Sequence, residues 1–488
     1  MNHLKKIFYC GYFILAALCS HAQKQKTAPV SFSNLSVLTP DSGRNVYVQR
    51  LDVTGTKQTK IYIVYREIQF KKGDSIPVSS LRQELEQARR QVYNTTLFND
   101  VNFTLTAIDS VNVAVKVHVT ERWYLYPIPQ FQLVDRNFNE WWNTFNHSLN
   151  RVNYGIKFVH YNLSGRRDQL RIYLINGYSR NIVFSYSNPY SNSNLNRGFS
   201  ASAGYSQNRE VSYRTSRTDS VQFYSEGPLK STTSGFVRQS WFVAGSYSIR
   251  KGFFTRQNIS AAYTYVKVAD SVIIKNRNYF KDSVRSMGYP DIAYTYQYTN
   301  VDNTSYSLKG TSWYFAALKR GWGLTSGVDM LQVEAGLNKY FSLGHNWYSS
   351  FNVSGKLKLP FDQAYLNQRG LGYGESYLRG LEYNVIDGVA IALLRSTIKR
   401  KLVSFNIPFR LFPKVLTKIP FTFFAKAYTD FGYVYNKPKY DTYLTNRLLY
   451  SGGFGIDILT LYDINLRLEY SFNQLKSNGL FFHTQNGF

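Results

Sequence analysis

Hydrophobic and polar side chains alternate along the chain from about residue 124 to the end. Between residues 464 and 473, Ile, Leu, Leu, Tyr and Phe alternate with Asn, Arg, Glu, Ser and Asn. Successive side chains of a β-strand point to opposite faces of a sheet. This period of two therefore predicts strands with one apolar and one polar face, in a fold that is mainly β.

Two architectures accommodate such strands. A soluble sandwich packs the apolar faces into a core, whereas a membrane barrel turns them to lipid and keeps the polar faces around its lumen. Most candidate strands run about 9–16 residues, which is long enough to cross a bilayer at a tilt. Charged and amide side chains recur on the polar faces, and aromatic side chains gather near strand ends. These features favour an antiparallel transmembrane β-barrel.

The alternating region predicts sixteen strands. An even number brings both ends of the barrel to the same side of the membrane, so the longest connections fall on the outer side. Those connections are 136–152, 210–237, 269–289 and 359–388. The predicted strands lie near residues 127–135, 153–163, 168–177, 180–188, 198–209, 238–250, 256–268, 290–299, 305–317, 327–341, 345–358, 389–402, 420–435, 449–460, 463–473 and 479–488.

Residues 1–22 predict a secretory signal peptide. Two lysines precede an apolar run from Ile7 to Cys19, and small residues frame a cleavage site after Ala22. This run is too short for a stable membrane anchor. Cleavage removes both cysteines of the chain, which suits export to an oxidising compartment.

The segment between the signal peptide and the alternating region divides into two parts. Residues 23–45 are rich in Ser, Thr, Pro and Gly, and we expect a flexible lead-in. Residues 46–121 show strand, helix, helix, strand and strand signals in that order. Ser80 is predicted to begin the second helix, with Gln83 as its capping-box partner. The βααββ order predicts one small α+β domain ahead of the barrel.

Short motifs in this domain resemble those of the polypeptide-transport-associated (POTRA) domain. Their order and spacing fit across the whole domain. The resemblance implies a periplasmic domain whose sheet edge holds an unfolded client. The matching residues are Val53-Thr54-Gly55, Thr59, Arg66-Glu67, Gly73-Asp74, Leu81, Leu97-Phe98-Asn99-Asp100-Val101 and Glu121.

The connection at 359–388 contains Leu378-Arg379-Gly380-Leu381. This segment resembles the Val/Ile-Arg-Gly-Phe/Tyr loop of the BamA/TamA outer-membrane assembly factors. The resemblance covers residues 46–488 and describes a short member, with a POTRA-like domain at 46–121 and a barrel at 122–488. The other motifs that resemble the family are Asn188-Pro189-Tyr190, Asp430-Phe431-Gly432-Tyr433-Val434, Gly453-Phe454-Gly455-Ile456 and the terminal aromatic residue Phe488.

The resemblance implies that the long loop folds into the lumen and that Arg379 meets carboxylates on the barrel wall. A guanidinium in a partly dry lumen needs such partners. Asp430 is the first candidate, and Asp457 or Glu469 is the reserve. All three carboxylates lie on the polar faces of their predicted strands.

The resemblance also implies a weak seam between the first strand, 127–135, and the last strand, 479–488. Pro127 and Pro129 cannot donate ladder hydrogen bonds, which suits a strand at an edge. The side chains expected to form the seam and the C-terminal assembly signal are Leu480, Phe482 and Phe488.

Together these features predict an outer-membrane barrel that inserts outer-membrane proteins or translocates a dedicated client. The POTRA-like domain would capture the client, and the seam would template an incoming strand. Expected partners are an unfolded outer-membrane or secreted client, outer-membrane lipids, and periplasmic proteins or lipoproteins. The alternative is a pore or lipid-moving channel, which a wide unplugged lumen would favour.

The sequence argues against other classes of function. The net charge of +28 is spread along the chain, and export removes the chain from the cytoplasm, so we expect no nucleic-acid partner. The sequence contains no His-Glu-x-x-His, Gly-x-Ser-x-Gly or P-loop motif, and we expect no enzyme activity. Its 7 histidines show no ligand spacing. We expect them in girdles or loops, with no metal and no cofactor.

Overall fold

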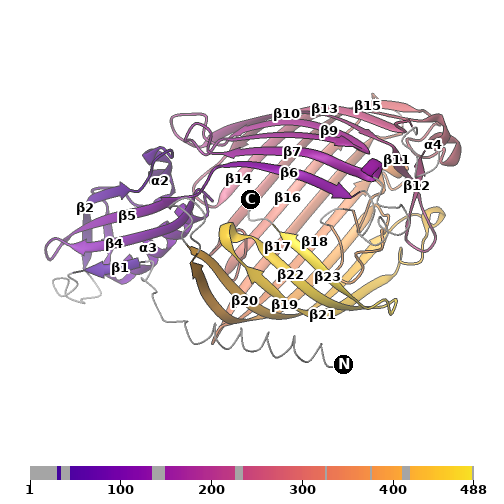
Figure 1. Cartoon of the computed structure of the whole chain (residues 1–488). Helices are drawn as coiled ribbons and strands as arrows, with labels where there is room; N and C mark the ends of the chain where they lie inside the picture. The colour runs from indigo at the N-terminus through magenta and orange to yellow at the C-terminus, as the bar shows by residue number, and fades with distance from the viewer. Residues whose placement is uncertain are drawn as a thin grey trace.

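The computed structural model describes residues 30–33, 44–133, 149–225, 235–324, 327–373, 376–408 and 418–485. A small α+β domain lies at one end of a large barrel (Figure 1). No helix in this part of the chain is long and apolar enough to span a membrane. The predicted signal peptide lies outside the described residues.

The small domain has the predicted βααββ order with two additional short strands. Its sheet has the order β1-β4-β5-β2-β3, and the two helices cover one face. The elements are β1 (Val30–Ser33), β2 (Asn45–Thr54), α2 (Ile61–Glu67), β3 (Ser75–Pro77), α3 (Val78–Tyr93), β4 (Phe98–Ala107) and β5 (Asn112–Glu121).

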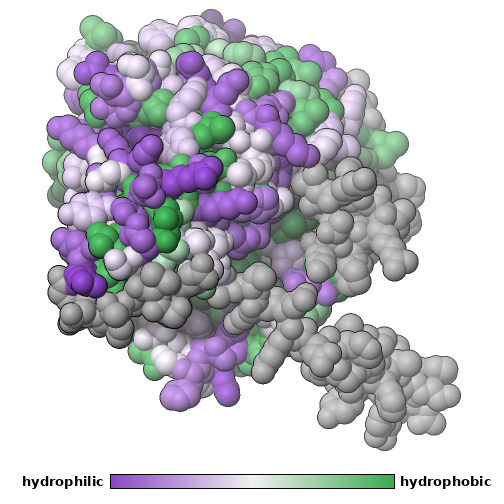
Figure 2. All heavy atoms as spheres, turned by 90° about the vertical axis from the view of Figure 1, so that its left-hand side faces the viewer, coloured by the Kyte–Doolittle hydropathy of each residue, from purple (hydrophilic) through white to green (hydrophobic). Residues whose placement is uncertain are grey.

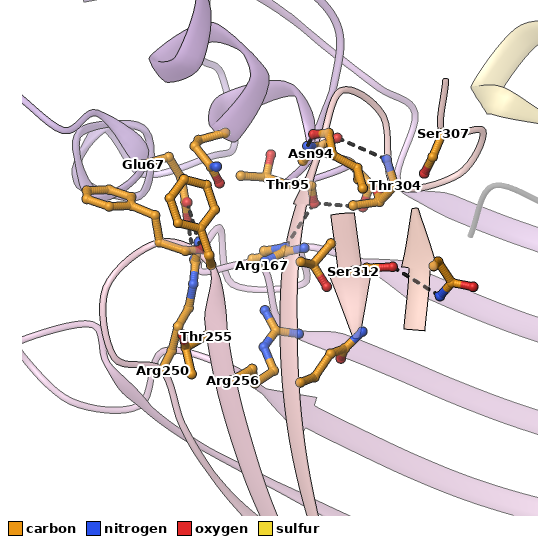
Figure 3. Close-up of a pocket in the computed structure, with 18 of the residues that line it drawn as sticks. Glu67, Asn94, Thr95, Arg167, Arg250, Thr255, Arg256, Thr304, Ser307 and Ser312 are labelled. Carbon is orange, nitrogen blue, oxygen red and sulfur yellow. Dashed lines mark hydrogen bonds and ion pairs between the residues drawn. The ribbon is translucent and has the colours of Figure 1, made fainter. Parts of the chain in front are cut away.

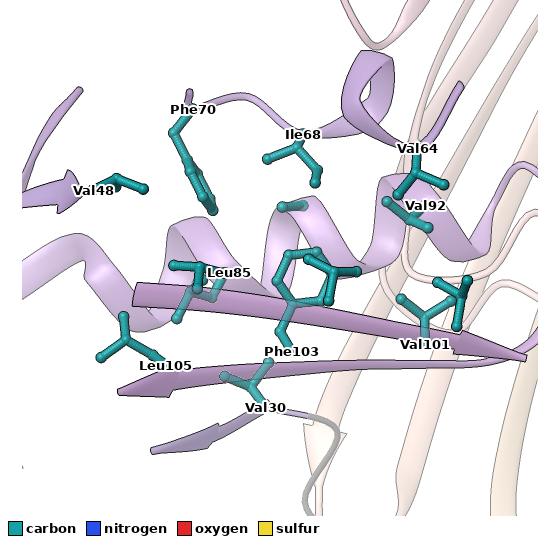
Figure 4. Close-up of a cluster of buried hydrophobic side chains, with 14 of the residues drawn as sticks. Val30, Val48, Val64, Ile68, Phe70, Leu85, Val92, Val101, Phe103 and Leu105 are labelled. Carbon is teal, nitrogen blue, oxygen red and sulfur yellow. The ribbon is translucent and has the colours of Figure 1, made fainter. Parts of the chain in front are cut away.

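Apolar side chains from the helices and the sheet form a continuous core between them (Figure 4). Leu85 and Val92 lie on the inner face of α3, and Phe103 and Leu105 come from β4; all four are fully buried. Because one face of this sheet is covered by helices, the domain has a hydrophobic core of its own.

Two expectations for this region were wrong. Val30–Ser33 lies in the predicted flexible lead-in but forms β1, which pairs in parallel with β4. Val30 is buried against the core, which explains why this segment forms a strand. The polar composition of the neighbouring residues concealed the strand in the sequence. The second helix begins at Val78, and Ser80 donates to the Pro77 carbonyl instead of capping the helix.

Sixteen strands of the described chain form one antiparallel sheet that curls into the barrel (Figure 1). The predicted number is confirmed, and the boundaries agree within a few residues except at β15 and β19, which extend further, and at β16, which begins five residues later than predicted. The strands are β6 (Leu125–Leu133), β7 (Val152–Tyr161), β8 (Gln169–Gly177), β9 (Ser179–Asn188), β10 (Arg197–Asn208), β13 (Arg238–Ile249), β14 (Thr255–Val268), β15 (Ser286–Val301), β16 (Gly310–Arg320), β17 (Met330–Gly344), β18 (Trp347–Leu359), β19 (Ala390–Pro408), β20 (Lys418–Tyr435), β21 (Leu448–Leu459), β22 (Asn465–Asn473) and β23 (Gly479–Gln485).

The two faces of the barrel wall differ as the alternation predicts. On β22, Glu469 and Ser471 are completely buried in the lumen, while Leu468, Tyr470 and Phe472 between and beside them are exposed outside. Figure 2 looks at the end of the molecule that carries the small POTRA-like α+β domain, where hydrophilic side chains dominate the middle of the face. The exposed apolar surface therefore follows the outward positions of the strands.

The barrel sheet has two edge strands. β6 and β23 stand at opposite ends of the strand order, and no ladder joins them among the described residues. Every other barrel strand pairs with a neighbour on each side. The free backbone groups of the sheet thus lie along the line where the first strand faces the last.

The end of the barrel away from the POTRA domain carries a packed cap (Figure 1). It contains a hairpin of β11 (Glu210–Thr215) and β12 (Val221–Ser225), and the short helix α4 (Asp270–Lys275). Val272, Phe280 and Val328 are fully buried inside it. The predicted connections at 210–237 and 269–289 contribute to this cap, whereas 136–148 lies outside the described residues.

We predict that Gly55→Ala destabilises the POTRA domain more than the matched variant Gly73→Ala. Both glycines have positive φ, +95° and +94°, so each alanine adds strain of about 1–2 kcal/mol. Only at Gly55 would the new Cβ meet the backbone, 1.9 Å from the Val119 carbonyl oxygen. Hydrogen exchange of β2 and β5 in the full-length protein measures the difference. Equal exchange in the two variants would contradict this account.

Candidate functional site

The connection from β18 to β19 enters the lumen and packs against the barrel wall. Leu378 and Leu381 are buried in an apolar cluster with residues of β19, β20 and β21. Gly380 between them has φ +87°, and a Cβ there would lie 3.0 Å from Ser471 Cβ. Its carbonyl accepts a hydrogen bond from Asn473 Nδ2 at 2.5 Å. Glycine at this position therefore permits both the turn and the close approach to β22.

Arg379 is buried and forms a two-point ion pair with Asp430 on β20. Its Nε donates to Asp430 Oδ2 at 2.8 Å, and its Nη2 donates to Oδ1. Its Nη1 donates to Thr397 Oγ1 at 3.0 Å, and its guanidinium carbon lies 4.0 Å from the centre of the Tyr428 ring. Asp430 is 0% exposed. A bidentate pair fixes direction as well as distance, so it orients the loop against β19 and β20.

The two reserve carboxylates lie beside a different cation. Asp457 and Glu469 both contact Lys426 Nζ, the latter through Oε1 at 2.6 Å. Asp457 also accepts from the Tyr306 hydroxyl at 2.8 Å and lies 3.7 Å from Lys399 Nζ. Neither carboxylate pairs with Arg379 among the described residues. The three predicted carboxylates thus belong to two adjacent ionic clusters, one around Arg379 and one around Lys426.

Two glycines on the inner face of β21 make room for these contacts. In the cross-strand rows, Gly453 separates Tyr428 from Ser471, and Gly455 separates Lys426 from the glutamate that it contacts. The Tyr428 hydroxyl reaches Ser471 Oγ at 2.6 Å across this gap. A Cβ on Gly453 would lie 2.7 Å from the Tyr428 hydroxyl oxygen. The Gly-x-Gly motif lets long side chains of β20 reach β22.

The predicted seam residues lie on the edge strand β23. Leu480 and Phe482 are 68% and 61% exposed on the outer face. Phe481 between them is buried and packs on the ring of Tyr383 in the lumen loop, with centroids 5.3 Å apart. Phe488 lies outside the described residues. Pro127 and Pro129 lie on β6, the other edge.

His483 was expected in a girdle or loop, and that expectation was wrong. It lies on β23 among lumen groups, and its ring stacks on Tyr377 with centroids 5.2 Å apart. Its Nε2 lies 3.4 Å from Glu382 and 3.6 Å from Glu469. Sequence reasoning missed this cluster because its members come from a loop and two strands, whose register no spacing rule gives.

A buried contact between the POTRA domain and the barrel was also missed. Glu67 at the end of α2 forms a two-point ion pair with Arg250 in the β13–β14 turn, where the Nη2–Oε2 distance is 2.6 Å. The Tyr190 hydroxyl donates to Glu67 Oε1 at 2.7 Å. Burial raises the pKa of Glu67, but the Arg250 guanidinium outweighs it and holds this pKa below its usual range.

This ion pair stands beside a polar cavity of about 440 Å³ between the POTRA domain and the barrel wall (Figure 3). Arg167 and Arg256 point into the cavity from the barrel side. Arg167 Nε donates to the Thr95 carbonyl at 2.9 Å, which ties a barrel turn to the end of α3. The Arg66-Glu67 and Asn188-Pro189-Tyr190 motifs were the signals in the sequence for this contact, although neither named its partner.

Other contacts spread the POTRA domain across the mouth of the barrel. Arg122 pairs with Asp463 in the β21–β22 turn at 2.8 Å, and Tyr93 donates to the same carboxylate group at 3.0 Å. Asn94 donates to the Val301 carbonyl at 3.2 Å, at the end of β15. The domain therefore contacts barrel turns that are far apart in the strand order.

We predict that Arg379→Ala lowers barrel stability by about 3–5 kcal/mol, because it leaves Asp430 buried without its cation. The double variant Arg379→Ala/Asp430→Ala should recover part of this loss, since the unpaired charge is gone. Arg369→Ala, on an exposed side chain of the same loop, is the matched control. The measurement is the temperature at which each of the four proteins (the parent and these three variants) loses the gel mobility of its folded form. A double variant no more stable than Arg379→Ala would argue against a coupled pair.

A second prediction concerns the effect of low pH on the contact between the POTRA domain and the barrel. Because the Glu67 pKa is lowered by folding, its ion pair stabilises POTRA docking above the ordinary carboxyl pKa of about 4.3 and weakens as pH falls below it. Spin labels on Tyr62→Cys and Lys251→Cys should give one narrow distance distribution at neutral pH and a broader one near pH 3. The distance distribution of Glu67→Gln should be broad at both pH values, and that of Glu86→Gln should match the parent at each pH. A narrow distribution in Glu67→Gln would refute the role of the ion pair.

Comparisons with known proteins agree with this architecture. Residues 46–122 match the POTRA family, described as surface antigen variable number repeat. CdiB from Escherichia coli is 12% identical with a TM-score of 0.52, covering 91% of this chain and 76% of CdiB. BamA from Haemophilus ducreyi lacking POTRA domains 1-3 is 14% identical with a TM-score of 0.48, covering 91% and 84%. No curated protein matches the sequence. The described part of the chain therefore shares its fold with CdiB, and has one POTRA domain ahead of a sixteen-stranded antiparallel barrel.

Proposed function

We propose that this chain is an outer-membrane barrel that assembles outer-membrane proteins or translocates a dedicated client. The observation that carries the proposal is the pair of edge strands, β6 and β23, which no ladder joins among the described residues. Backbone groups at a sheet edge in lipid need partners. A client strand can supply them by β-augmentation, and its own folding then provides the free energy.

The side chains along both edges suit such a client. Ile128 and Phe131 on β6 are 43% and 66% exposed, and Leu480 and Phe482 on β23 are exposed to a similar degree. The two prolines of β6 remove backbone donors from that edge. Fewer backbone donors are then available on β6 to hold the first and last strands together.

The POTRA domain supports a role in client capture, although short strands already cover both edges of its sheet. Its sheet ends at β1 and β3, which are only 4 and 3 residues long. β1 covers the β4 edge through four residue pairs. In this proposal a client strand displaces β1 or extends the sheet beyond it, on the periplasmic side of the membrane.

The packed cap favours client handling over a passive pore. A passive pore requires an open path, whereas the cap buries Val272, Phe280 and Val328 at the far end of the lumen. The lumen loop narrows the interior further through its contacts with Asp430. Lipids still contact the protein in this proposal, through the outward apolar positions and through phosphates near its many basic side chains.

The first experiment is quantitative outer-membrane proteomics after depletion of this protein. A broad fall in barrel proteins supports general assembly, and the loss of one or a few proteins indicates a dedicated client. An unchanged proteome would overturn general assembly and favour the pore or lipid-moving channel.

A tethered seam gives a sharper test. Phe131→Cys/Phe482→Cys places two exposed thiols on the outer faces of the two edge strands, and bifunctional reagents of increasing length then link them. We expect the link to block client delivery in depleted cells. The matched control is Leu468→Cys/Phe482→Cys, whose positions are already direct partners on β22 and β23. Full delivery by the seam-linked protein would show that the edges need not separate.

A further inference from the structure

Three potential metal ligands meet where the lumen loop touches the last two strands. They are Glu382 of the loop, Glu469 of β22 and His483 of β23, and one ligand atom from each lies within 4.8 Å of the others. Glu382 follows the Leu378–Leu381 segment directly, so the backbone that carries Arg379 also carries this carboxylate.

The polar atoms of this cluster are buried and lack hydrogen bonds. Both carboxylate oxygens of Glu382, both of Glu469, and Nε2 of His483 have no hydrogen-bond partner among the described residues. Glu469 is 0% exposed. Its Oε1 has an ionic contact with Lys426 at 2.6 Å, while its Oε2 lies 3.6 Å from His483 Nε2. Buried polar groups without hydrogen bonds are costly unless another partner neutralises them.

The surroundings orient these groups toward one another. The Tyr377 ring stacks on the imidazole at an interplanar angle of 17°, which limits its rotation. Lys426 occupies one oxygen of Glu469 and leaves the other facing the imidazole. Outer contacts of this kind hold metal ligands in place.

We propose that Glu382, Glu469 and His483 bind a divalent transition-metal ion such as Zn²⁺ in the lumen. One imidazole nitrogen and two carboxylates are three protein ligands of the type that Zn²⁺ accepts, with water completing the shell. Ligand atoms that each lie about 2.0–2.2 Å from one tetrahedral Zn²⁺ are about 3.5 Å from one another, close to the 3.4 and 3.6 Å that separate Nε2 of His483 from the two carboxylates.

The bound ion would join three parts of the chain. It would link the loop segment after Arg379 to β22 and to the edge strand β23. This inference goes beyond the proposed function, since the ion binds whether or not the barrel handles a client. It does predict that metal holds the loop and the last strand together.

The alternative occupant is a proton. A protonated His483 would form ion pairs with both glutamates at their present distances, 3.4 and 3.6 Å, without a metal. The experiment must therefore detect the metal directly rather than infer it from stability alone.

The test uses tag-free, full-length protein in detergent, stripped with chelator and then dialysed against Zn²⁺. We expect about one Zn²⁺ per chain by elemental analysis and a higher temperature for loss of folded gel mobility. Co²⁺ in place of Zn²⁺ should give visible absorption bands that report nitrogen and oxygen ligands. His483→Gln and Glu382→Gln should each weaken binding about 10-fold or more.

Two matched controls remove the same side chains elsewhere. His118→Gln removes an exposed imidazole of the POTRA domain, and Glu334→Gln removes a lumen carboxylate that pairs with Lys356. Both should bind Zn²⁺ as the parent does. Glu382→Gln changes a loop rather than a strand, so it keeps the test valid if His483→Gln fails to fold. Absence of stoichiometric Zn²⁺ and Co²⁺, or binding that survives Glu382→Gln unchanged, would overturn the proposal.

Discussion

A charged side chain buried inside the barrel needs an opposite charge or hydrogen-bond acceptors at contact distance, because burial removes the water that would otherwise solvate it. Lys426 meets Asp457 and Glu469 because β20, β21 and β22 pair in one particular register. A slip by one residue would turn these carboxylates to the outer face. The ionic clusters therefore require the register of the last strands, and the lumen loop packs on the surface that this register creates.

The lumen loop is anchored to one side of the seam. Arg379 binds β20, the carbonyl of Gly380 accepts from β22, and Tyr383 packs on β23. The two sides of the seam are thus unequal, since the C-terminal side carries the loop and the N-terminal side carries the prolines.

Much of the fold follows from local pattern, whereas the contacts of the site do not. Period-two alternation was enough to predict sixteen strands, because each residue's face depends only on its neighbours in sequence. The pairing of Lys426 with Glu469 depends on register across a glycine of β21, which a single sequence does not give. β1 escaped prediction because four residues hold too few alternations to stand out from a polar segment. The role of Glu67 escaped because its partner Arg250 lies on a distant turn.

The spread of POTRA contacts around the barrel mouth has a mechanical consequence. The domain touches the turn after β13 through Arg250, the end of β15 through Val301, and the turn before β22 through Asp463. The POTRA domain thus connects turns at the mouth of a barrel in which no ladder joins β6 to β23 among the described residues. If separation of β6 from β23 moves these turns apart, some of the contacts must break. By linkage, a ligand that weakens these contacts between the POTRA domain and the barrel lowers the free energy needed to separate β6 from β23. The reduction equals the free energy by which the ligand weakens the contacts.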